Sequence, residues 1–308
     1  MKIDRRRFLF STAIITGIPG IMSSFAKGEP VKSAAAPSGN IKVGVISQAN
    51  NPEEDLKIVR DMGFHVCQLS VGTFSQELAK RLSDTLAKYD IKAVSLICSG
   101  PGRDVYTFVE GPLTIGLVPR ENREARVRHL KEGIDFCKAA GIPAIQSHFG
   151  FIPENPNDAL YKEFIATMKP LGEYAMKNGI EIYFETGQET PVTLLRAITD
   201  IGTGNLFVNY DTANLILYGK SNPVDGLKVI GKYVKSLHAK DGHYPTDPYQ
   251  LGMEVPIPTG DVDFPAVVSS LKKLGFGGSI IIEYELAGSS REYLLKTKDY
   301  LEKLISSD

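Results

Sequence analysis

Ile180-Glu-Ile-Tyr-Phe-Glu185 is a short apolar run that stops at a carboxylate, and three later runs also stop at an acidic residue or a histidine. They are Leu206-Phe-Val-Asn-Tyr-Asp211, Tyr233-Val-Lys-Ser-Leu-His238 and Ile280-Ile-Ile-Glu283. In a barrel of parallel strands, the carboxyl ends of the strands converge on one face, where active sites are built. We therefore expect Glu185, Asp211, His238 and Glu283 to meet on that face.

Three carboxylates around one imidazole would repel one another unless a divalent cation held them. A donor set of three oxygens and one nitrogen suits Mn²⁺, Mg²⁺, Co²⁺ or Zn²⁺. We predict one divalent metal ion bound by Glu185, Asp211, His238 and Glu283, with Mn²⁺ as the first expectation.

Outward from these runs, strand-like and helix-like segments alternate about eight times from residue 41 onward. The strand candidates are short and mostly rich in Val and Ile, as strands buried on both faces should be. They cover residues 41–47, 65–70, 91–97, 143–148, 179–185, 205–211, 233–238 and 279–283. Amphipathic spacing predicts helices over residues 121–140, 158–178 and 289–306, and Gly141, Gly179 and Gly275 stand where helices should end.

This alternation predicts an α/β protein with a parallel sheet. Eight repeats favour a closed (β/α)8 barrel over an open doubly wound sheet. No G-x-G-x-x-G motif follows the first strand candidate, which argues against a dinucleotide-binding fold. One barrel takes about 250 residues, so the 308 residues of the chain fit a single domain over residues 41–308.

Two connections, residues 99–120 and 240–261, are too long to be simple turns, and both follow strand candidates. Loops of this length in a compact domain are usually functional. Their aromatic side chains would either stack on a sugar ring or pack the loops down, and the sequence leaves both readings open; they are Tyr106, Phe108, Tyr244 and Tyr249.

Residues 1–26 have the three parts of an export signal: a basic start, an apolar stretch and a small-x-small site at Ser24-Phe25-Ala26. Arg5-Arg6-Arg7-Phe8-Leu9 resembles the twin-arginine motif of proteins exported in the folded state. The alternative is an uncleaved anchor, but the apolar run of about 15 residues is shorter than the ~20 that span a bilayer. We expect cleavage, a flexible linker over residues 27–40, no remaining membrane span, and a location in the periplasm or cell envelope.

Charge and cysteine content exclude some functions. The formal net charge is −1 and no long Lys/Arg run occurs, so we expect no nucleic-acid partner. The three cysteines, Cys67, Cys98 and Cys137, cannot all pair and form no C-x-x-C motif. We expect Cys67 and Cys98, which lie in strand-like runs, to be small buried hydrophobes.

Five motifs together resemble a known family: the xylose isomerase-like TIM barrel superfamily, and within it the sugar phosphate isomerase/epimerase family. The resemblance covers about residues 41–305. The motifs are Tyr183-Phe-Glu-Thr-Gly-Gln-Glu189, Tyr210-Asp-Thr-Ala-Asn214, Leu237-His-Ala-Lys-Asp241, Gly260-Asp-Val-Asp-Phe264 and Ile282-Glu283.

The resemblance implies that Glu185 and Glu283 bind the metal and also act as catalytic acid and base, while Asp211 and His238 are ligands only. It implies that Lys240 and Asp241 support the site or contact substrate. His148 resembles a histidine that contacts substrate in relatives.

Two departures from the family pattern concern the substrate. Asn214 stands where many relatives have a substrate-contacting histidine, and Pro258-Thr-Gly260 replaces a Gly-x-Gly. Nuclease members of the superfamily use additional histidine and acidic ligands, and the five histidines of this chain do not match that pattern.

The sequence thus predicts an exported, divalent-metal-dependent sugar isomerase or epimerase that transfers a proton through a metal-stabilised enediolate. The alternative with the same site is a lyase that eliminates the aglycone from 3-keto-glycosides. A non-catalytic sugar-binding barrel is the alternative from another class. The expected partner is a small sugar or keto-sugar; the sequence does not specify whether the chain forms a homo-oligomer.

Overall fold

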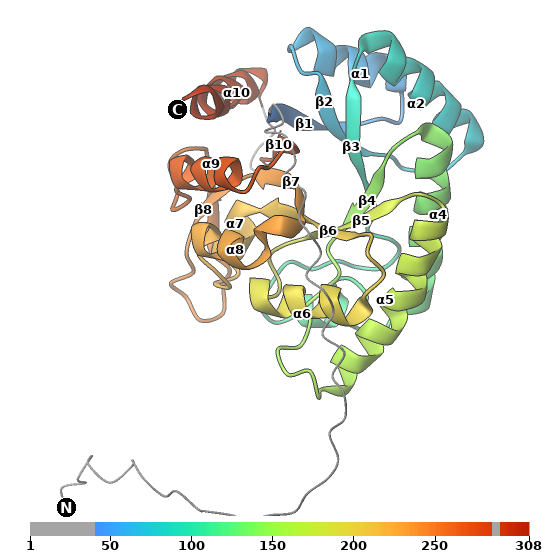
Figure 1. Ribbon diagram of the computed structural model, residues 1–308, viewed down its shortest axis with the longest axis vertical. Coiled ribbons are helices and arrows are strands. Elements are labelled where there is room, and N and C mark those ends of the chain that lie inside the picture. Colours follow the sequence, from blue (N-terminus) through green and yellow to red (C-terminus); the bar gives the residue numbers. More distant parts are fainter. Residues whose placement is uncertain (1–40, 285–289, 308) are drawn as a thin grey trace, which may run out of the picture. The chain divides into compact units, whose positions relative to one another are not determined.

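Eight parallel strands close into a barrel in the computed structural model, which describes residues 41–284 and 290–307 (Figure 1). The strands follow one another around the barrel in the order β1-β10-β7-β6-β5-β4-β3-β2. Their bounds are β1 Lys42–Gln48, β2 Val66–Ser70, β3 Lys92–Ile97, β4 Ala144–Ser147, β5 Glu181–Glu185, β6 Leu206–Asp211, β7 Val234–Ala239 and β10 Ser279–Ile282. The predicted α/β barrel is confirmed. The predicted export signal and linker, residues 1–40, lie outside the described residues.

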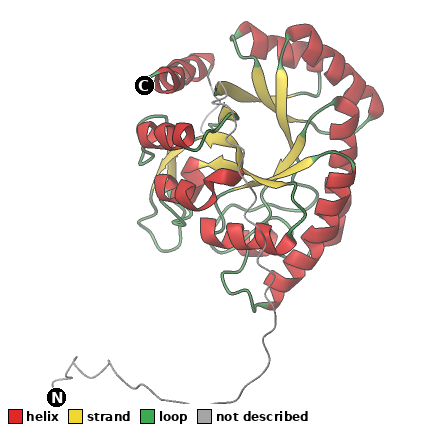
Figure 2. Ribbon diagram, in the orientation of Figure 1, coloured by secondary structure: helices red, strands yellow, loops and turns green. Residues whose placement is uncertain are grey.

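Helices surround the strands on the outside of the barrel (Figure 2). The longer ones are α1 Pro52–Asp61, α2 Gln76–Tyr89, α4 Arg123–Ala140, α5 Ala159–Lys177, α6 Pro191–Ile201, α8 Pro223–Ile230, α9 Phe264–Lys273 and α10 Arg291–Ser306. Several begin at a side chain that accepts a backbone N–H, such as Ser75 for α2 and Asp158 for α5. Gly141 ends α4 at a φ of 72°, a conformation that glycine adopts without strain.

Apolar side chains from five strands form a layer inside the barrel, on the side nearer the amino-terminal ends of the strands. This cluster contains Val66, Val94, Ala144, Tyr183 and Ile281. Because side chains alternate along a strand, the residue two positions further on points into the barrel one layer nearer the carboxyl end. On four of these strands that next layer is polar, and it contains Gln68, Gln146, Glu185 and Glu283. On β3 the register with β2 is irregular, and Ser95, one residue beyond Val94, accepts a hydrogen bond from Gln68.

A larger hydrophobic core lies between the strands and the helices. The three cysteines are free, buried thiols, as we predicted for Cys67 and Cys98. Burial raises the pKa of both thiols to about 12, so they stay protonated near neutral pH.

Both long connections carry short elements of their own. Residues 99–120 include the single-turn helix α3 Gly111–Thr114, and residues 240–261 include an antiparallel pair, β8 Asp241–His243 and β9 Met253–Val255. Two further short helices, α7 Thr212–Leu217 and η1 Gly231–Tyr233, lie before β7.

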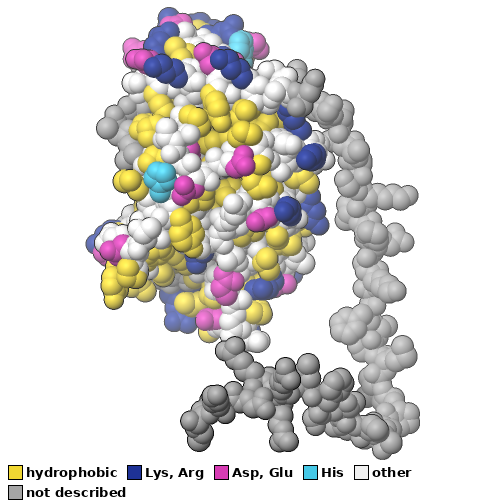
Figure 3. Space-filling view, turned by 90° about the vertical axis from the view of Figure 1, so that its left-hand side faces the viewer, with side chains coloured by type: hydrophobic (Ala, Val, Ile, Leu, Met, Phe, Trp, Pro, Cys, Tyr) yellow, Lys and Arg dark blue, Asp and Glu magenta, His cyan; other side chains and the backbone are white. Residues whose placement is uncertain are grey.

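The surface mixes charges of both signs. On the face in Figure 3, acidic and basic side chains are interspersed with apolar ones. Among the described residues, no helix combines the length and apolarity that crossing a bilayer requires.

Candidate metal centre

The four predicted ligands come together at the carboxyl end of the barrel. One ligand atom each from Glu185, Asp211, His238 and Glu283 lies within 4.8 Å of the others. Glu185 and Asp211 end β5 and β6, His238 is the penultimate residue of β7, and Glu283 directly follows β10. The register between neighbouring strands brings these ligands to the same level. Asp211 on β6 pairs with His238 on β7, and the backbone N–H of Glu283 donates to the carbonyl of Ala239 on β7 at 3.1 Å.

Two threonine hydroxyls tie neighbouring strand ends together. The backbone N–H of Asp211 donates to Thr186 Oγ1 at 2.9 Å, and that hydroxyl lies 3.0 Å from the Asp211 carbonyl oxygen. Thr212 Oγ1 donates to the carbonyl of Lys240 at 2.7 Å. Each threonine directly follows a predicted ligand, so these bonds fix the spacing between β5, β6 and β7 beside the site.

The two carboxylate oxygens of Asp211 differ in their contacts. Oδ1 accepts the backbone N–H of Asn214 at 2.7 Å and so caps helix α7. Oδ2 is buried and has no hydrogen-bond partner. A buried, unpaired carboxylate oxygen is costly unless a cation meets it. Burial, with the nearby carboxylates of Glu283 and Glu185, raises the pKa of Asp211 to about 7.

His238 presents one ring nitrogen to the carboxylates and the other to an amide. Nδ1 lies 3.0 Å from Glu185 Oε1, 2.7 Å from Glu283 Oε2 and 3.7 Å from Asp211 Oδ2. Nε2 lies 2.6 Å from Gln68 Oε1. Burial alone would lower the pKa of His238, but the carboxylates of Glu283 and Glu185 hold it well above its ordinary value. The negative charge gathered at Nδ1 is what a divalent cation would neutralise.

Basic groups and an amide lie beside the two glutamates. Gln146 Nε2 donates to Glu185 Oε2, and His148 Nε2 lies 3.4 Å from the same oxygen. Lys240 Nζ lies 3.7 Å from Glu283 Oε1. Burial would raise the pKa of both carboxyls, yet His148 and His238 lower the pKa of Glu185, while His238 and Lys240 hold that of Glu283 well below its usual range.

The residues predicted to contact substrate lie at different places around this centre. His148 directly follows β4, one residue beyond its end, and its Nδ1 lies 3.1 Å from Gln188 Oε1. Lys240 is buried, and its ammonium also lies 3.9 Å from Glu254 Oε2 on β9. Asn214 is buried at the start of α7, where Cβ of the side chain lies against Gly187.

Asp241 serves the loop that follows β7. Its two carboxylate oxygens accept the backbone N–H groups of Gly242, Gly260 and Val262 at 2.8 to 3.1 Å. Of the two roles that the sequence allowed, support of the site is the one that this geometry favours. These bonds hold the two ends of the 240–261 connection together.

The aromatic side chains of the long connections differ in their contacts. Tyr106 packs edge-on against His148, with ring centroids 5.6 Å apart, and is half exposed. Phe108 packs against Tyr218, which places it beside α7. Tyr244 and Tyr249 are largely exposed. Tyr106 therefore directly contacts a predicted site residue.

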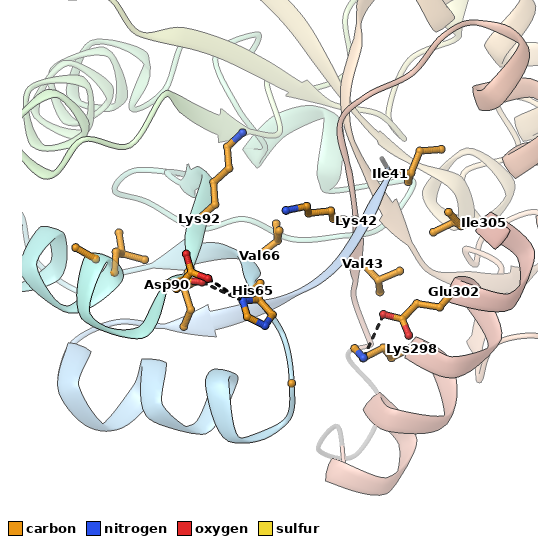
Figure 4. A pocket seen from close by; sticks show the side chains of 14 residues that line it. Ile41, Lys42, Val43, His65, Val66, Asp90, Lys92, Lys298, Glu302 and Ile305 are labelled. Atoms are coloured by element: carbon orange, nitrogen blue, oxygen red, sulfur yellow. Dashed lines mark hydrogen bonds and ion pairs between the residues drawn. The ribbon is translucent and has the colours of Figure 1, made fainter. Parts of the chain in front are cut away.

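A separate hollow of about 610 Å³ lies at the opposite, amino-terminal end of the strands (Figure 4). The residues that begin β1 and β3 line it together with residues of α10, and two pairs of side chains at its edge are His65 with Asp90 and Lys298 with Glu302. None of the four predicted ligands lines it. This hollow is therefore distinct from the metal centre.

Sequence reasoning missed five residues that the structure places around the ligands: Gln68, Gln146, Thr186, Thr212 and Glu254. The two glutamines carried a signal, because each is a polar residue inside an apolar strand run. The threonines could have been found as the residues that follow Glu185 and Asp211. Glu254 carried no signal, since only the β8–β9 pairing brings it to Lys240.

The donor set fits a divalent cation. It combines three carboxylates with one imidazole, all but Glu283 are buried, and Asp211 Oδ2 has no hydrogen-bond partner. Hard carboxylate oxygens with one imidazole nitrogen suit Mn²⁺, Mg²⁺ and related ions.

Comparison with known proteins agrees with this architecture. Residues 56–304 match a family model described as xylose isomerase-like TIM barrel. A crystal structure described as a xylose isomerase domain protein from Planctomyces limnophilus is 30% identical and has a TM-score of 0.79, with 86% of this chain and 97% of that one covered. An uncharacterized protein of Methanocaldococcus jannaschii is 26% identical over 282 residues, which cover 80% of this chain and 92% of the relative.

Two more distant structures share the fold. One is described as a D-tagatose 3-epimerase-like protein, with 20% identity, a TM-score of 0.67 and coverage of 86% of this chain and 97% of its own. The other is described as 3-keto-D-glucoside 4-epimerase from E. coli, with 14% identity, a TM-score of 0.64 and coverage of 87% and 100%.

Proposed function

Because the chain belongs to the xylose isomerase-like TIM barrel family, we propose that it is a divalent-metal-dependent enzyme that isomerises or epimerises a sugar or keto-sugar. The observation that carries this proposal is the set of four ligand atoms within 4.8 Å, built from two glutamates, an aspartate and a histidine. Glu185, Asp211, His238 and Glu283 would hold the cation, with Mn²⁺ as the first expectation. When bound, it would polarise a sugar carbonyl and the neighbouring hydroxyl.

The positions of the two glutamates support a proton transfer from two sides of the substrate. Glu185 belongs to β5 and Glu283 follows β10, and β6 and β7 separate these strands in the barrel. One carboxylate can therefore remove the proton from the carbon beside a carbonyl while the other returns it. His238 and Lys240 keep Glu283 ionised, the state that a base requires. Gln146 holds Glu185 through Oε2 and so orients the second carboxylate.

The same site supports elimination, which is the second candidate. A lyase acting on 3-keto-glycosides would need an acid to protonate the departing oxygen after the neighbouring C–H proton is removed. Lys240, 3.7 Å from Glu283, and His148, 3.4 Å from Glu185, are proton-bearing groups beside the two candidate bases. Release of the aglycone is therefore a second reaction that an assay should test separately from epimerisation.

A solvent-exchange experiment tests proton transfer before the natural sugar is known. The purified chain is loaded with Mn²⁺, incubated in D₂O with ketoses and 3-keto-glycosides, and the products are analysed by NMR and mass spectrometry. Deuterium at the carbon beside the carbonyl together with a new epimer or isomer would support the proposal. Release of aglycone would favour the lyase, and metal binding without exchange or product would favour a sugar-binding barrel.

Glu283→Gln is the decisive variant in this assay. The amide removes the base and a ligand charge, so we expect kcat to fall by roughly 10²–10⁴-fold with the fold retained. Glu292→Gln, an exposed change on α10, is the matched control and should keep full activity. Full activity of Glu283→Gln would contradict the assigned mechanism.

We also propose, from residues 1–26, that the chain is exported to the periplasm or cell envelope. Free or oxidised glycosides are better matched to that location than phosphorylated sugars. Fractionation of cells that express the full-length chain, with mass spectrometry of the mature amino terminus, tests the export and a cleavage site after Ala26.

A further inference from the structure

A buried chain of three side chains leads from β3 through β2 to the metal centre. Ser95, Gln68 and His238 are at most 1% exposed. Gln68 Nε2 donates to Ser95 Oγ at 2.9 Å, and Gln68 Oε1 lies 2.6 Å from His238 Nε2. The three residues stand on β3, β2 and β7, so this chain crosses the interior of the barrel.

The direction of these bonds determines which nitrogen of His238 is available. Because the Gln68 amide nitrogen donates to Ser95, its oxygen faces the imidazole and can only accept a hydrogen bond. His238 must then carry a proton on Nε2. In the neutral ring this leaves the lone pair on Nδ1, the nitrogen that lies 3.0 Å from Glu185 and 2.7 Å from Glu283. That is the nitrogen that a metal ion shared with the carboxylates would use.

We propose that Gln68, oriented by Ser95, is a positioning residue that fixes the tautomer and ring orientation of His238 for metal binding. The inference rests on the metal-dependent function proposed above. Outer hydrogen-bond partners of ligating histidines typically account for roughly a 10–100-fold change in metal affinity. Gln68 touches neither the three carboxylates nor, by this geometry, the metal, so its effect should appear in metal binding before catalysis.

The test measures binding of Mn²⁺ alone, by electron paramagnetic resonance titration of the metal-stripped protein. Gln68→Met keeps the side-chain volume close but removes the acceptor, and we expect Mn²⁺ to bind roughly 10–100-fold more weakly. Gln68→Glu keeps an acceptor toward Nε2–H and should bind Mn²⁺ at least as tightly as the natural chain. Ser95→Ala lets the amide rotate and should fall between the two.

A second readout separates loss of this hydrogen bond from a general structural effect. In the Mg²⁺-loaded protein, the Nε2–H proton of His238 should resonate far downfield and exchange slowly with solvent in the natural chain and in Gln68→Glu, because it donates to an oxygen of residue 68. Gln68→Met should lose this downfield shift and slow exchange while its circular dichroism spectrum stays unchanged.

The outcomes distinguish failure of this inference from failure of the proposed function. If the natural chain binds Mn²⁺ and Gln68→Met binds it within about twofold of the same affinity, the role of Gln68 is overturned and the metal site stands. If the natural chain binds no Mn²⁺ and no Mg²⁺, the metal site is overturned and this inference with it.

Discussion

Glu189 is a buried carboxyl group outside the metal centre, and its environment changes its pKa. It lies four residues beyond Glu185 and is only 4% exposed. Burial raises the pKa of Glu189 to about 8; the nearby Glu154 carboxylate acts in the same direction, and Lys220 opposes it. A carboxyl in this environment is protonated in the folded protein at neutral pH and ionised in the unfolded chain.

This difference makes the contribution of Glu189 to stability depend on pH. Between the ordinary pKa of a glutamate and a pKa of about 8, the folded state keeps the proton of Glu189 and the unfolded chain does not. The contribution of Glu189 to the free energy of unfolding is therefore fully present below the ordinary pKa and is lost as the pH rises toward 8. Relative to Glu189→Gln, the natural chain should lose up to about 1.4 kcal/mol of unfolding free energy per pH unit in this window. Urea unfolding of both proteins at pH 5, 6.5 and 8 measures this difference in unfolding free energy.

An exposed change provides the control for this pH series. Glu124→Gln lies on the outside of α4 and should leave the pH dependence of unfolding as it is in the natural chain. Parallel pH curves for the natural chain and Glu189→Gln would show that Glu189 ionises normally in the folded state.

At the scale of elements, the connection at residues 99–120 is organised by one buried arginine of α4. Arg126 is 1% exposed, and its guanidinium donates to the carbonyls of Pro101, Arg103 and Gly116 and to the carboxylate of Asp104 at 2.9 to 3.1 Å. A single guanidinium thus satisfies four acceptors of one loop. The loop also carries Tyr106, which packs on His148 beside the metal centre.

Arg126→Met should therefore loosen this loop and weaken the site. Removal of the guanidinium leaves the Asp104 carboxylate and several carbonyls without their donor, so we expect a loss of about 3 kcal/mol in unfolding free energy. KM should rise more than kcat falls, because Tyr106 and His148 lose their fixed arrangement. Urea unfolding and limited proteolysis within residues 99–120 measure the two effects.

Arg128→Met, an exposed change on the same helix, is the control for this variant. It removes the same charge without touching the loop, so both the proteolysis rate and stability should stay close to those of the natural chain. Equal proteolysis of the two variants would mean that Arg126 does not hold the loop.

The elements that bear the ligands were predictable, and the residues that orient those ligands were mostly not. A strand run that stops at Glu185 or Asp211 marks a strand end, and parallel strands bring such ends together. Gln68 stands inside a run of the same kind, where one sequence gives no reason to prefer a partner on β7, distant by 170 residues. Glu254 depends on β8 and β9, which are too short to show any periodicity.

At the scale of the whole molecule, the metal centre joins strands that are distant in sequence. Its ligands span residues 185 to 283 and belong to β5, β6, β7 and the end of β10. This arrangement exists only when the barrel is closed, so the free energy of metal binding adds to the free energy of folding. The stability of the protein should therefore depend on the concentration of free metal.

Metal removal should lower the melting temperature, and one variant isolates the cause. At a free Mn²⁺ concentration of 100 times Kd, binding adds about 2.7 kcal/mol, which corresponds to a rise of about 5–10 °C for a barrel of this size. Asp211→Asn still has an oxygen to cap α7 through the Asn214 N–H but loses the charge of the second oxygen. Calorimetry of the natural chain with Mn²⁺ and with EDTA should show this rise, and Asp211→Asn should show little of it. An equal rise in both proteins would place the stabilising metal elsewhere in the molecule.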